Sequence, residues 1–253
     1  MIHLRRAIWL FSGICLPTLC GLCGCGTSQY ETLLAKEIKA IRSGAPWARF
    51  WDYTTVPGVP VKVRIPEMFK TSYQLNSPHE QDDGPINAAR AQPPFLNLPG
   101  FRLVFEDFYD EGIASRAPYY CYLAAQKSTP QQAQALAADL LAKLTAKFPN
   151  MNPPPKWEDV DCKTPEGGTL AWKKLTIFGD QFFDIDAGAA GGIQNRSMPA
   201  TFELWLYEGQ GYCVLIGWRI NTEWDKKVGL LKMAPLAAGT VQIIEAAAAA
   251  PAP

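Results

Sequence analysis

Alternation of apolar and polar residues marks several short segments of this 253-residue chain as β-strands. The clearest is Val61-Lys-Val-Arg-Ile65, where every second residue is apolar, as in a strand with one buried face. Other segments are rich in aromatic and β-branched residues. Gly209-Gln-Gly211 predicts a hairpin between the last two strands, and hence antiparallel pairing. We predict strands at 61–65, 101–105, 119–125, 157–162, 170–178, 182–185, 201–207 and 212–220.

Three other segments repeat apolar residues at helical spacing, which predicts amphipathic helices at 30–42, 129–148 and 223–244. The middle one has the clearest start, because Thr129 can cap the helix, Pro130 suits its first turn and Gln132 completes a capping box. We expect the last helix to be kinked at Pro235.

The polar stretches between these elements predict loops. Residues 70–98 form the longest, which is either a functional surface loop or disordered. The acidic stretch 106–112 is expected to begin a connection between two strands, and the glycine-rich stretch 187–197 to be a mobile loop. The Ala/Pro-rich tail 245–253 has nothing to bury and predicts disorder.

The order of these elements predicts an α+β fold, an antiparallel sheet flanked by helices, in a single domain at 56–244. Over roughly these residues, the order resembles that of the photosystem extrinsic protein PsbP and its relatives, a fold that several bacterial lipoproteins also use. The resemblance implies a layered sandwich. It rests on element order without a diagnostic motif, and it implies no functional residues.

The N-terminus has the three parts of a secretory signal. Arg5 and Arg6 precede an apolar run, Ala7 to Leu22, that ends in small residues. The segment Leu22-Cys-Gly-Cys25 resembles the lipobox of bacterial lipoproteins, in which the last cysteine receives a diacylglycerol and becomes the new N-terminus. This resemblance implies lipidation of Cys25.

An uncleaved anchor helix is the alternative, although the apolar run is shorter than the ~20 residues that span a bilayer. Either way, the chain would be held at a membrane by its N-terminus. We therefore expect a lipoprotein signal peptide at 1–24, a tether and N-terminal helix at 25–55, and a location in the cell envelope, at the periplasmic or outer face.

Charge and histidine content exclude several functions. Equal numbers of basic and acidic residues, 24 of each, give no electrostatic case for nucleic acid. His3 lies in the leader, which leaves His79, within a polar loop, for the whole domain. A Ser-His-Asp or Cys-His arrangement would therefore have to use this loop histidine, and no Gly-x-Ser-x-Gly occurs.

Three cysteines remain outside the leader, Cys121, Cys162 and Cys213, each within a predicted strand. In an oxidising compartment, two of them could form a disulfide and leave one thiol, and the sequence does not choose the pair. We favour the alternative that all three are buried core residues, because free cysteine packs as a small apolar side chain. The spacings suit neither zinc nor a redox motif.

Acidic residues offer a weaker signal. Asp184-x-Asp186-x-Gly188 is similar to a fragment of a calcium loop, but it lacks the later ligands of an EF-hand. A second acidic cluster lies at 106–111. Either could supply one carboxylate of an acid/base pair, although acidic turns are mostly solvated. We predict no cofactor.

Aromatic residues gather in the C-terminal half of the chain. Alternation along 202–207 places Glu203, Trp205 and Tyr207 on the polar-looking face of a strand. Trp205 and Tyr207 could bind a sugar ring or a partner protein. We prefer the simpler interpretation that a helix covers this face.

These observations favour a membrane-anchored lipoprotein whose non-catalytic domain binds a ligand or an envelope protein. The alternative is an envelope hydrolase that uses acidic residues. A pocket with two carboxylates within ~10 Å of each other would support the enzyme, and an exposed aromatic patch would support the binding protein.

Overall fold

The computed structural model describes residues 31, 34, 35, 45–75, 101–110, 116–186 and 192–244. The predicted leader, Cys25, His79 and the tail 245–253 lie outside the described residues, as does most of the predicted helix 30–42. Of the N-terminal unit, Met1–Pro46, the structure describes Glu31, Leu34 and Ala35, which are helical, and the start of a 3-10 helix, η1 (Ala45–Trp47). No helix among the described residues has the length and apolar character needed to cross a bilayer.

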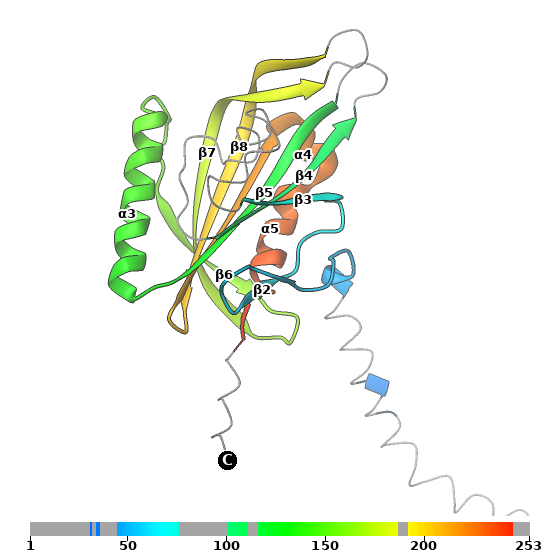
Figure 1. Cartoon of the computed structure of the whole chain (residues 1–253), viewed down its shortest axis with the longest axis vertical. Helices are drawn as coiled ribbons and strands as arrows, with labels where there is room; N and C mark the ends of the chain where they lie inside the picture. Colours follow the sequence, from blue (N-terminus) through cyan, green and yellow to red (C-terminus); the bar gives the residue numbers. More distant parts are fainter. Residues whose placement is uncertain are drawn as a thin grey trace, which may run out of the picture. The chain divides into compact units, whose positions relative to one another are not determined.

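The second unit, Trp47–Pro253, contains two antiparallel sheets and three helices within its described part (Figure 1). The small sheet has the strand order β1-β2-β10, and the large one has the order β3-β4-β5-β9-β8-β7-β6. The predicted α+β class, with an antiparallel sheet flanked by helices, is therefore confirmed. The elements are β1 (Thr54–Thr55), β2 (Val61–Val63), β3 (Thr71–Leu75), β4 (Phe101–Asp110), β5 (Arg116–Lys127), α3 (Pro130–Lys147), β6 (Trp157–Lys163), β7 (Thr169–Asp186), β8 (Ile193–Gly209), β9 (Tyr212–Asn221), α4 (Thr222–Val228), α5 (Leu230–Ala238) and β10 (Gln242–Ile243).

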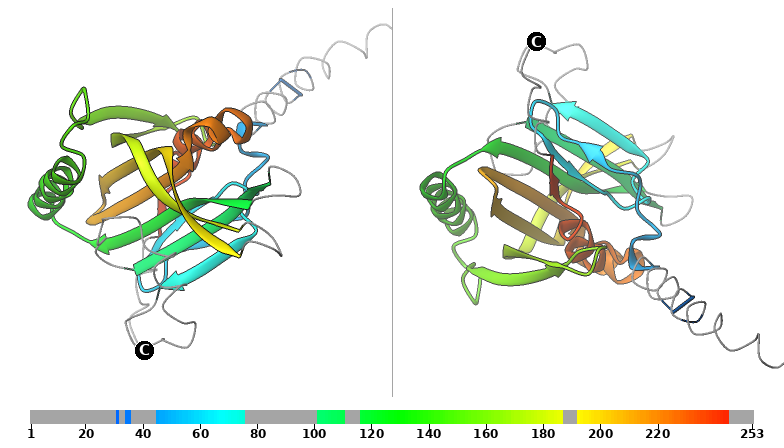
Figure 2. Two further views of the ribbon diagram at one scale, coloured as in Figure 1. Left: turned by 90° about the horizontal axis from the view of Figure 1, so that it is seen from above. Right: turned by 90° about the horizontal axis from the view of Figure 1, so that it is seen from below.

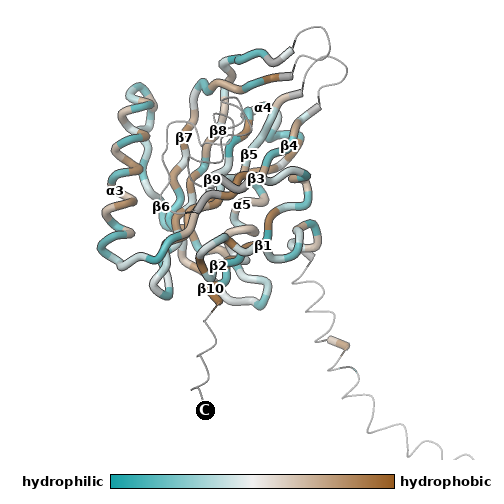
Figure 3. The backbone as a smooth tube through the Cα atoms, in the orientation of Figure 1, coloured by the Kyte–Doolittle hydropathy of each residue, from teal (hydrophilic) through white to brown (hydrophobic). Residues whose placement is uncertain are grey.

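Helix α3 begins as its local sequence predicts. The Thr129 hydroxyl accepts a hydrogen bond from the Gln132 amide, and the Gln132 side chain accepts one from the Thr129 amide, which is the predicted capping box. The buried side of the helix carries Ala133, Ala137, Leu140 and Leu144. Figure 3 shows the apolar and polar residues alternating along α3, as expected of a helix with one buried side.

Strands β7 and β8 are longer than predicted. The prediction placed a break between two strands at 178–182 and a loop at 187–197. Instead, β7 runs without interruption from Thr169 to Asp186, and its pairing with β8 continues from Lys173–Leu206 to Asp186–Ile193. Only residues 187–191 of the predicted loop lie outside the described part. The pairing partner overrides the local turn preference of Gly179-Asp180, which face Ala200 and Pro199.

The far end of this β7–β8 ribbon curls across the large sheet. Asp186 of β7 pairs with Arg116 of β5, beyond the point where β9 ends. Figure 2, which looks along the large sheet, shows the yellow ends of β7 and β8 crossing the neighbouring strands. Helices α4 and α5 lie away from α3 in both views. The end of β7 is therefore paired along both edges, with β8 on one side and with β5 on the other.

Further predicted boundaries were wrong. Residues 71–75, at the start of the predicted loop 70–98, form strand β3, because they pair with β4. The acidic stretch 106–112 is part of strand β4 as far as Asp110, because its residues pair with β5. The predicted helix 223–244 is two short helices, α4 and α5, followed by β10, and it breaks at Gly229 rather than at Pro235. Gly229 has a φ of 70°, the left-handed conformation that commonly ends a helix. Trp47 and Phe50, which we assigned to the tether, are buried in the core.

The core is continuous across the large sheet, the small sheet and the helices. The Phe69 ring, in the segment between β2 and β3, contacts the rings of Phe105, Tyr119 and Trp218, which all belong to the large sheet. The Trp47 indole donates a hydrogen bond to the Leu236 carbonyl in α5. The largest fully buried side chains are those of Trp172, Trp218, Tyr122, Phe183, Phe202, Ile65, Leu123, Leu140, Leu144, Leu175 and Ile177.

Candidate binding surface and groove

Trp205 and Tyr207 do not form the exposed surface that the alternation suggested. Only 2% of Trp205 is exposed, and Tyr207 is half-buried. The ring of Trp172 packs against both, with its centre 6.4 Å from that of Trp205 and 5.2 Å from that of Tyr207. Helices α4 and α5 contact the surrounding strands β6, β8 and β9. Burial in the core makes the Trp205 indole unavailable to a ligand, in agreement with the preferred interpretation that this face is covered.

The polar groups beside Trp205 satisfy one another. The indole Nε1 donates a 3.1 Å hydrogen bond to Glu203 Oε2, and Lys174 Nζ lies 3.7 Å from Glu203 Oε1. Burial raises the pKa of the Glu203 carboxyl, and the attraction of Lys174 opposes that rise. The buried carboxylate of Glu203 therefore has two partners, the Trp205 indole and the Lys174 ammonium group, which offset the cost of its burial.

The three cysteines are buried free thiols, so the disulfide alternative is wrong and the core interpretation is confirmed. None of them faces another cysteine in the sheet. Burial raises the pKa of Cys162 and of Cys213 to about 12, and raises that of Cys121 well above its usual value. Because the thiolate is the reactive form, these side chains are poor nucleophiles at neutral pH.

Asp184 and Asp186 lie in strand β7 rather than in a loop. Asp184 Oδ1 accepts a 2.9 Å hydrogen bond from Asn195 Nδ2 on β8, and Asp186 takes part in the pairing with β5 and β8. Within the described ranges, no group of three or more His, Cys, Asp or Glu residues could hold a metal ion. The glycine-rich residues that follow, 187–191, lie outside those ranges.

Two phenylalanines, Phe178 and Phe182, stand exposed on the outer side of β7, with 56% and 65% of their surfaces accessible. Because side chains alternate along a strand, Asp180 projects between them on the same side. Pro199 and Ser197 of β8 face Asp180 and Phe182 across the ladder. We call these five residues the phenylalanine face. Large apolar side chains grouped on a surface mark interaction sites more often than scattered ones do.

Buried contacts hold this strand segment from its inner side. Arg219 of β9 is 6% exposed, donates a 3.1 Å hydrogen bond from Nε to Gln181 Oε1, and donates another from a terminal nitrogen to the Phe182 carbonyl. Its guanidinium carbon lies 4.2 Å from the centre of the Phe183 ring. A buried arginine therefore fixes the backbone at Phe182. A contact made by this side chain would cost little backbone conformational entropy.

Sequence analysis missed the phenylalanine face because it divided β7 into two strands. Side chains alternate between the two faces only within one continuous strand. With a break at 179–181, Phe178 and Phe182 have no predicted face in common. The available signal was the spacing Phe178-x-x-x-Phe182, which has a fixed meaning only if the strand is continuous.

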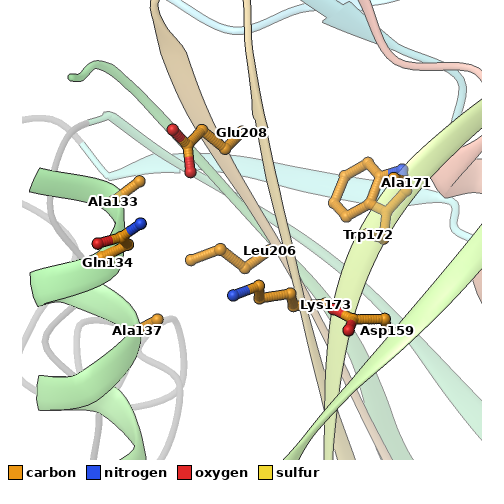
Figure 4. Close-up of a pocket in the computed structure, with 9 residues that line it drawn as sticks. All are labelled: Ala133, Gln134, Ala137, Asp159, Ala171, Trp172, Lys173, Leu206 and Glu208. Atoms are coloured by element: carbon orange, nitrogen blue, oxygen red, sulfur yellow. The ribbon is translucent and has the colours of Figure 1, made fainter. Parts of the chain in front are cut away.

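A groove of about 180 Å³ lies between α3 and strands β6, β7 and β8 (Figure 4). Its apolar walls include Ala133 and Ala137 of α3 and Leu206 of β8. Three charged side chains, all exposed, surround it: Asp159 of β6, Lys173 of β7 and Glu208 of β8. Two exposed carboxylates, Asp159 and Glu208, therefore border one groove, which is part of what a hydrolase would need.

Comparison with known proteins adds little. No protein-family profile matches the chain, and no curated protein matches it in sequence. The solution structure of cyanobacterial PsbP (CyanoP) from Synechocystis sp. PCC 6803 is similar with a TM-score of 0.35 and 8% sequence identity, over 78% of this chain and 94% of that one. A crystal structure from Bacteroides thetaiotaomicron VPI-5482 is similar with a TM-score of 0.27 and 12% identity, over 57% of this chain and 45% of that one.

At these TM-scores, neither likeness supports a statement about function. The case for function rests on the residues of this chain.

Proposed function

We propose that this protein is a lipoprotein of the cell envelope, held at a membrane by lipid on Cys25, and that its α+β domain is a non-catalytic module that binds another envelope protein. The observation that carries the binding role is the phenylalanine face. The anchor rests on the lipobox-like leader, in which Leu22 and Gly24 precede Cys25 at the expected places.

The chemistry of the phenylalanine face indicates the kind of partner. Burying Phe178 and Phe182 would contribute about 1.5–3 kcal/mol for each side chain, enough for a specific contact. Asp180 lies between them and forms no ion pair with another described residue. The complementary surface therefore carries an apolar hollow for the aromatic rings and a Lys or Arg opposite Asp180.

The test is site-specific photo-crosslinking in intact cells that export the full chain. A photoreactive residue at position 182, and separately at 178, should give one discrete adduct of higher mass. The same residue at Lys143, on the exposed side of α3, is the matched control and should give none. The proposal fails if positions 178 and 182 give no adduct, or if the control gives the same one.

A second measurement separates binding from folding. Phe182→Ser should weaken the isolated complex by tenfold or more, because it removes at least ~1.4 kcal/mol of apolar burial. Its thermal stability should stay close to that of the wild type, because the side chain is exposed. Asp180→Lys should weaken the complex further if a basic residue faces Asp180. An unchanged affinity in both variants would contradict the assignment of this face.

A further inference from the structure

The groove of Figure 4 carries three charges that no described residue neutralises. Lys173 lies directly opposite Asp159 in the pairing of β7 with β6, the position where a cross-strand ion pair would form. No such ion pair occurs. Figure 4 shows the Lys173 side chain pointing toward α3, beside Leu206, with Asp159 on the opposite side of the Lys173 backbone. Its ammonium group is therefore directed into the groove.

A second carboxylate, that of Glu208, lies on the other neighbouring strand, β8. Glu208 follows Leu206 by two residues on β8, so both side chains project to the same side of the sheet. Figure 4 shows the Glu208 carboxylate turned toward α3, near Ala133 and the Gln134 amide. A cation donor, a carboxylate and an amide thus border one space whose floor is apolar.

We propose that this groove binds a small zwitterion, a molecule such as a free amino acid with a short apolar side chain. Its carboxylate would meet Lys173, its ammonium group would meet Glu208, and its apolar part would lie against Leu206, Ala133 and Ala137. A ligand that carried only a carboxylate would leave both Glu208 and Asp159 unmatched, and one that carried only an amine would leave Lys173 unmatched. The groove has a volume of about 180 Å³, which leaves room for a ligand of this size.

The groove is open and its charges are exposed, so the affinity should be modest. Ion pairs in contact with water are screened, and a dissociation constant between micromolar and millimolar is expected. Such an affinity suits a site that samples the concentration of a small solute, and it is independent of the phenylalanine face on the far part of β7.

Calorimetric titration of the full chain in detergent micelles tests the proposal, with L-leucine as the probe. The matched comparators are 3-methylbutylamine, which is leucine without its carboxylate, and 4-methylpentanoic acid, which is leucine without its amine. Leucine should bind saturably, and each comparator should bind at least tenfold more weakly. Equal binding of either comparator overturns the zwitterion assignment, and the absence of saturable binding by all three overturns the site.

Variants place the binding in the groove. Lys173→Met and Glu208→Gln should each weaken leucine binding at least tenfold. Ala171→Leu adds a larger side chain at an exposed position lining the groove and should abolish binding without unfolding the domain. Lys156→Met, at a lysine that is 74% exposed, should bind like the wild type. Unchanged binding in Lys173→Met and Ala171→Leu would show that leucine binds elsewhere and would overturn the proposal.

Discussion

Arg219 ties strand β9 to the outer part of β7. Its guanidinium bonds to the Gln181 side chain and the Phe182 carbonyl and stacks on Phe183, all within the core. Arg219→Ala removes the donors and leaves buried acceptors without a partner. We expect a loss of about 3–5 kcal/mol in the free energy of unfolding, measured by urea denaturation.

Two further variants test whether the effect is specific to the Arg219 guanidinium and its several donors. Arg219→Lys keeps the charge but presents a single ammonium, which cannot reach both acceptors, so it should recover only part of the loss. Arg196→Ala removes an exposed arginine on β8 whose hydrogen bonds go to Gln194, and should change stability by less than about 0.5 kcal/mol. Full stability in Arg219→Ala would show that β7 and β8 hold the ribbon without the arginine.

At the scale of elements, the C-terminal end of helix α5 fits closely on strand β6. The end of the helix is Gly239, where a Cβ atom would lie 2.0 Å from the Lys163 carbonyl oxygen. The backbone fixes the position of the Cβ atom, and the Lys163 oxygen is itself a backbone atom, so a rotamer change cannot relieve the clash. We expect Gly239→Ala to lower the free energy of unfolding by about 1–3 kcal/mol or more, measured by denaturant titration.

Gly229→Ala is the matched comparison, because a Cβ there meets only the Lys232 side chain, at an ordinary contact distance of 3.9 Å, but the backbone is left-handed. It should cost about 1 kcal/mol, through conformation alone. If Gly239→Ala proved no more costly than Gly229→Ala, helix α5 would have to be able to move away from β6 with little loss.

The elements also show which features were readable from sequence. The start of α3 was predicted correctly because its signals, Thr129, Pro130 and Gln132, lie within four residues of one another. The length of β7 was not, since Gly179-Asp180 favours a turn locally and the pairing that straightens it comes from β8. Alternation placed Trp205 and Tyr207 on one side of a strand, but whether that side is exposed depends on helices later in the chain.

For the whole molecule, the fold class could be predicted from local sequence signals, whereas the candidate sites could not. The α+β class follows from the order of elements, which is a property of the chain. The candidate sites follow from contacts between distant segments, Arg219 with Gln181 and Lys173 with the α3 groove, which have no local signature. The proposed position of the protein in the cell rests on a third kind of information, the predicted leader at 1–24.

The predicted leader leads to a prediction about membrane anchoring. Cys25→Ser removes the thiol that the lipid would occupy and leaves the apolar run and Arg5 and Arg6 intact. Because two or three acyl chains bind a bilayer far more firmly than one, we expect the exported wild type to partition into detergent and Cys25→Ser to lose most of that partitioning.

Mass spectrometry of the mature N-terminus is the direct measurement, and Cys23→Ser is the matched control, because Leu22 precedes Cys23 where a small residue is needed. The control should keep a lipid-modified N-terminus at Cys25. If Cys25→Ser still partitioned fully into detergent, the apolar run itself would be the anchor, as in the uncleaved alternative. The domain would then reach its partner from a membrane-spanning segment, and the lipid part of the proposed function would be wrong while the role of the phenylalanine face would stand.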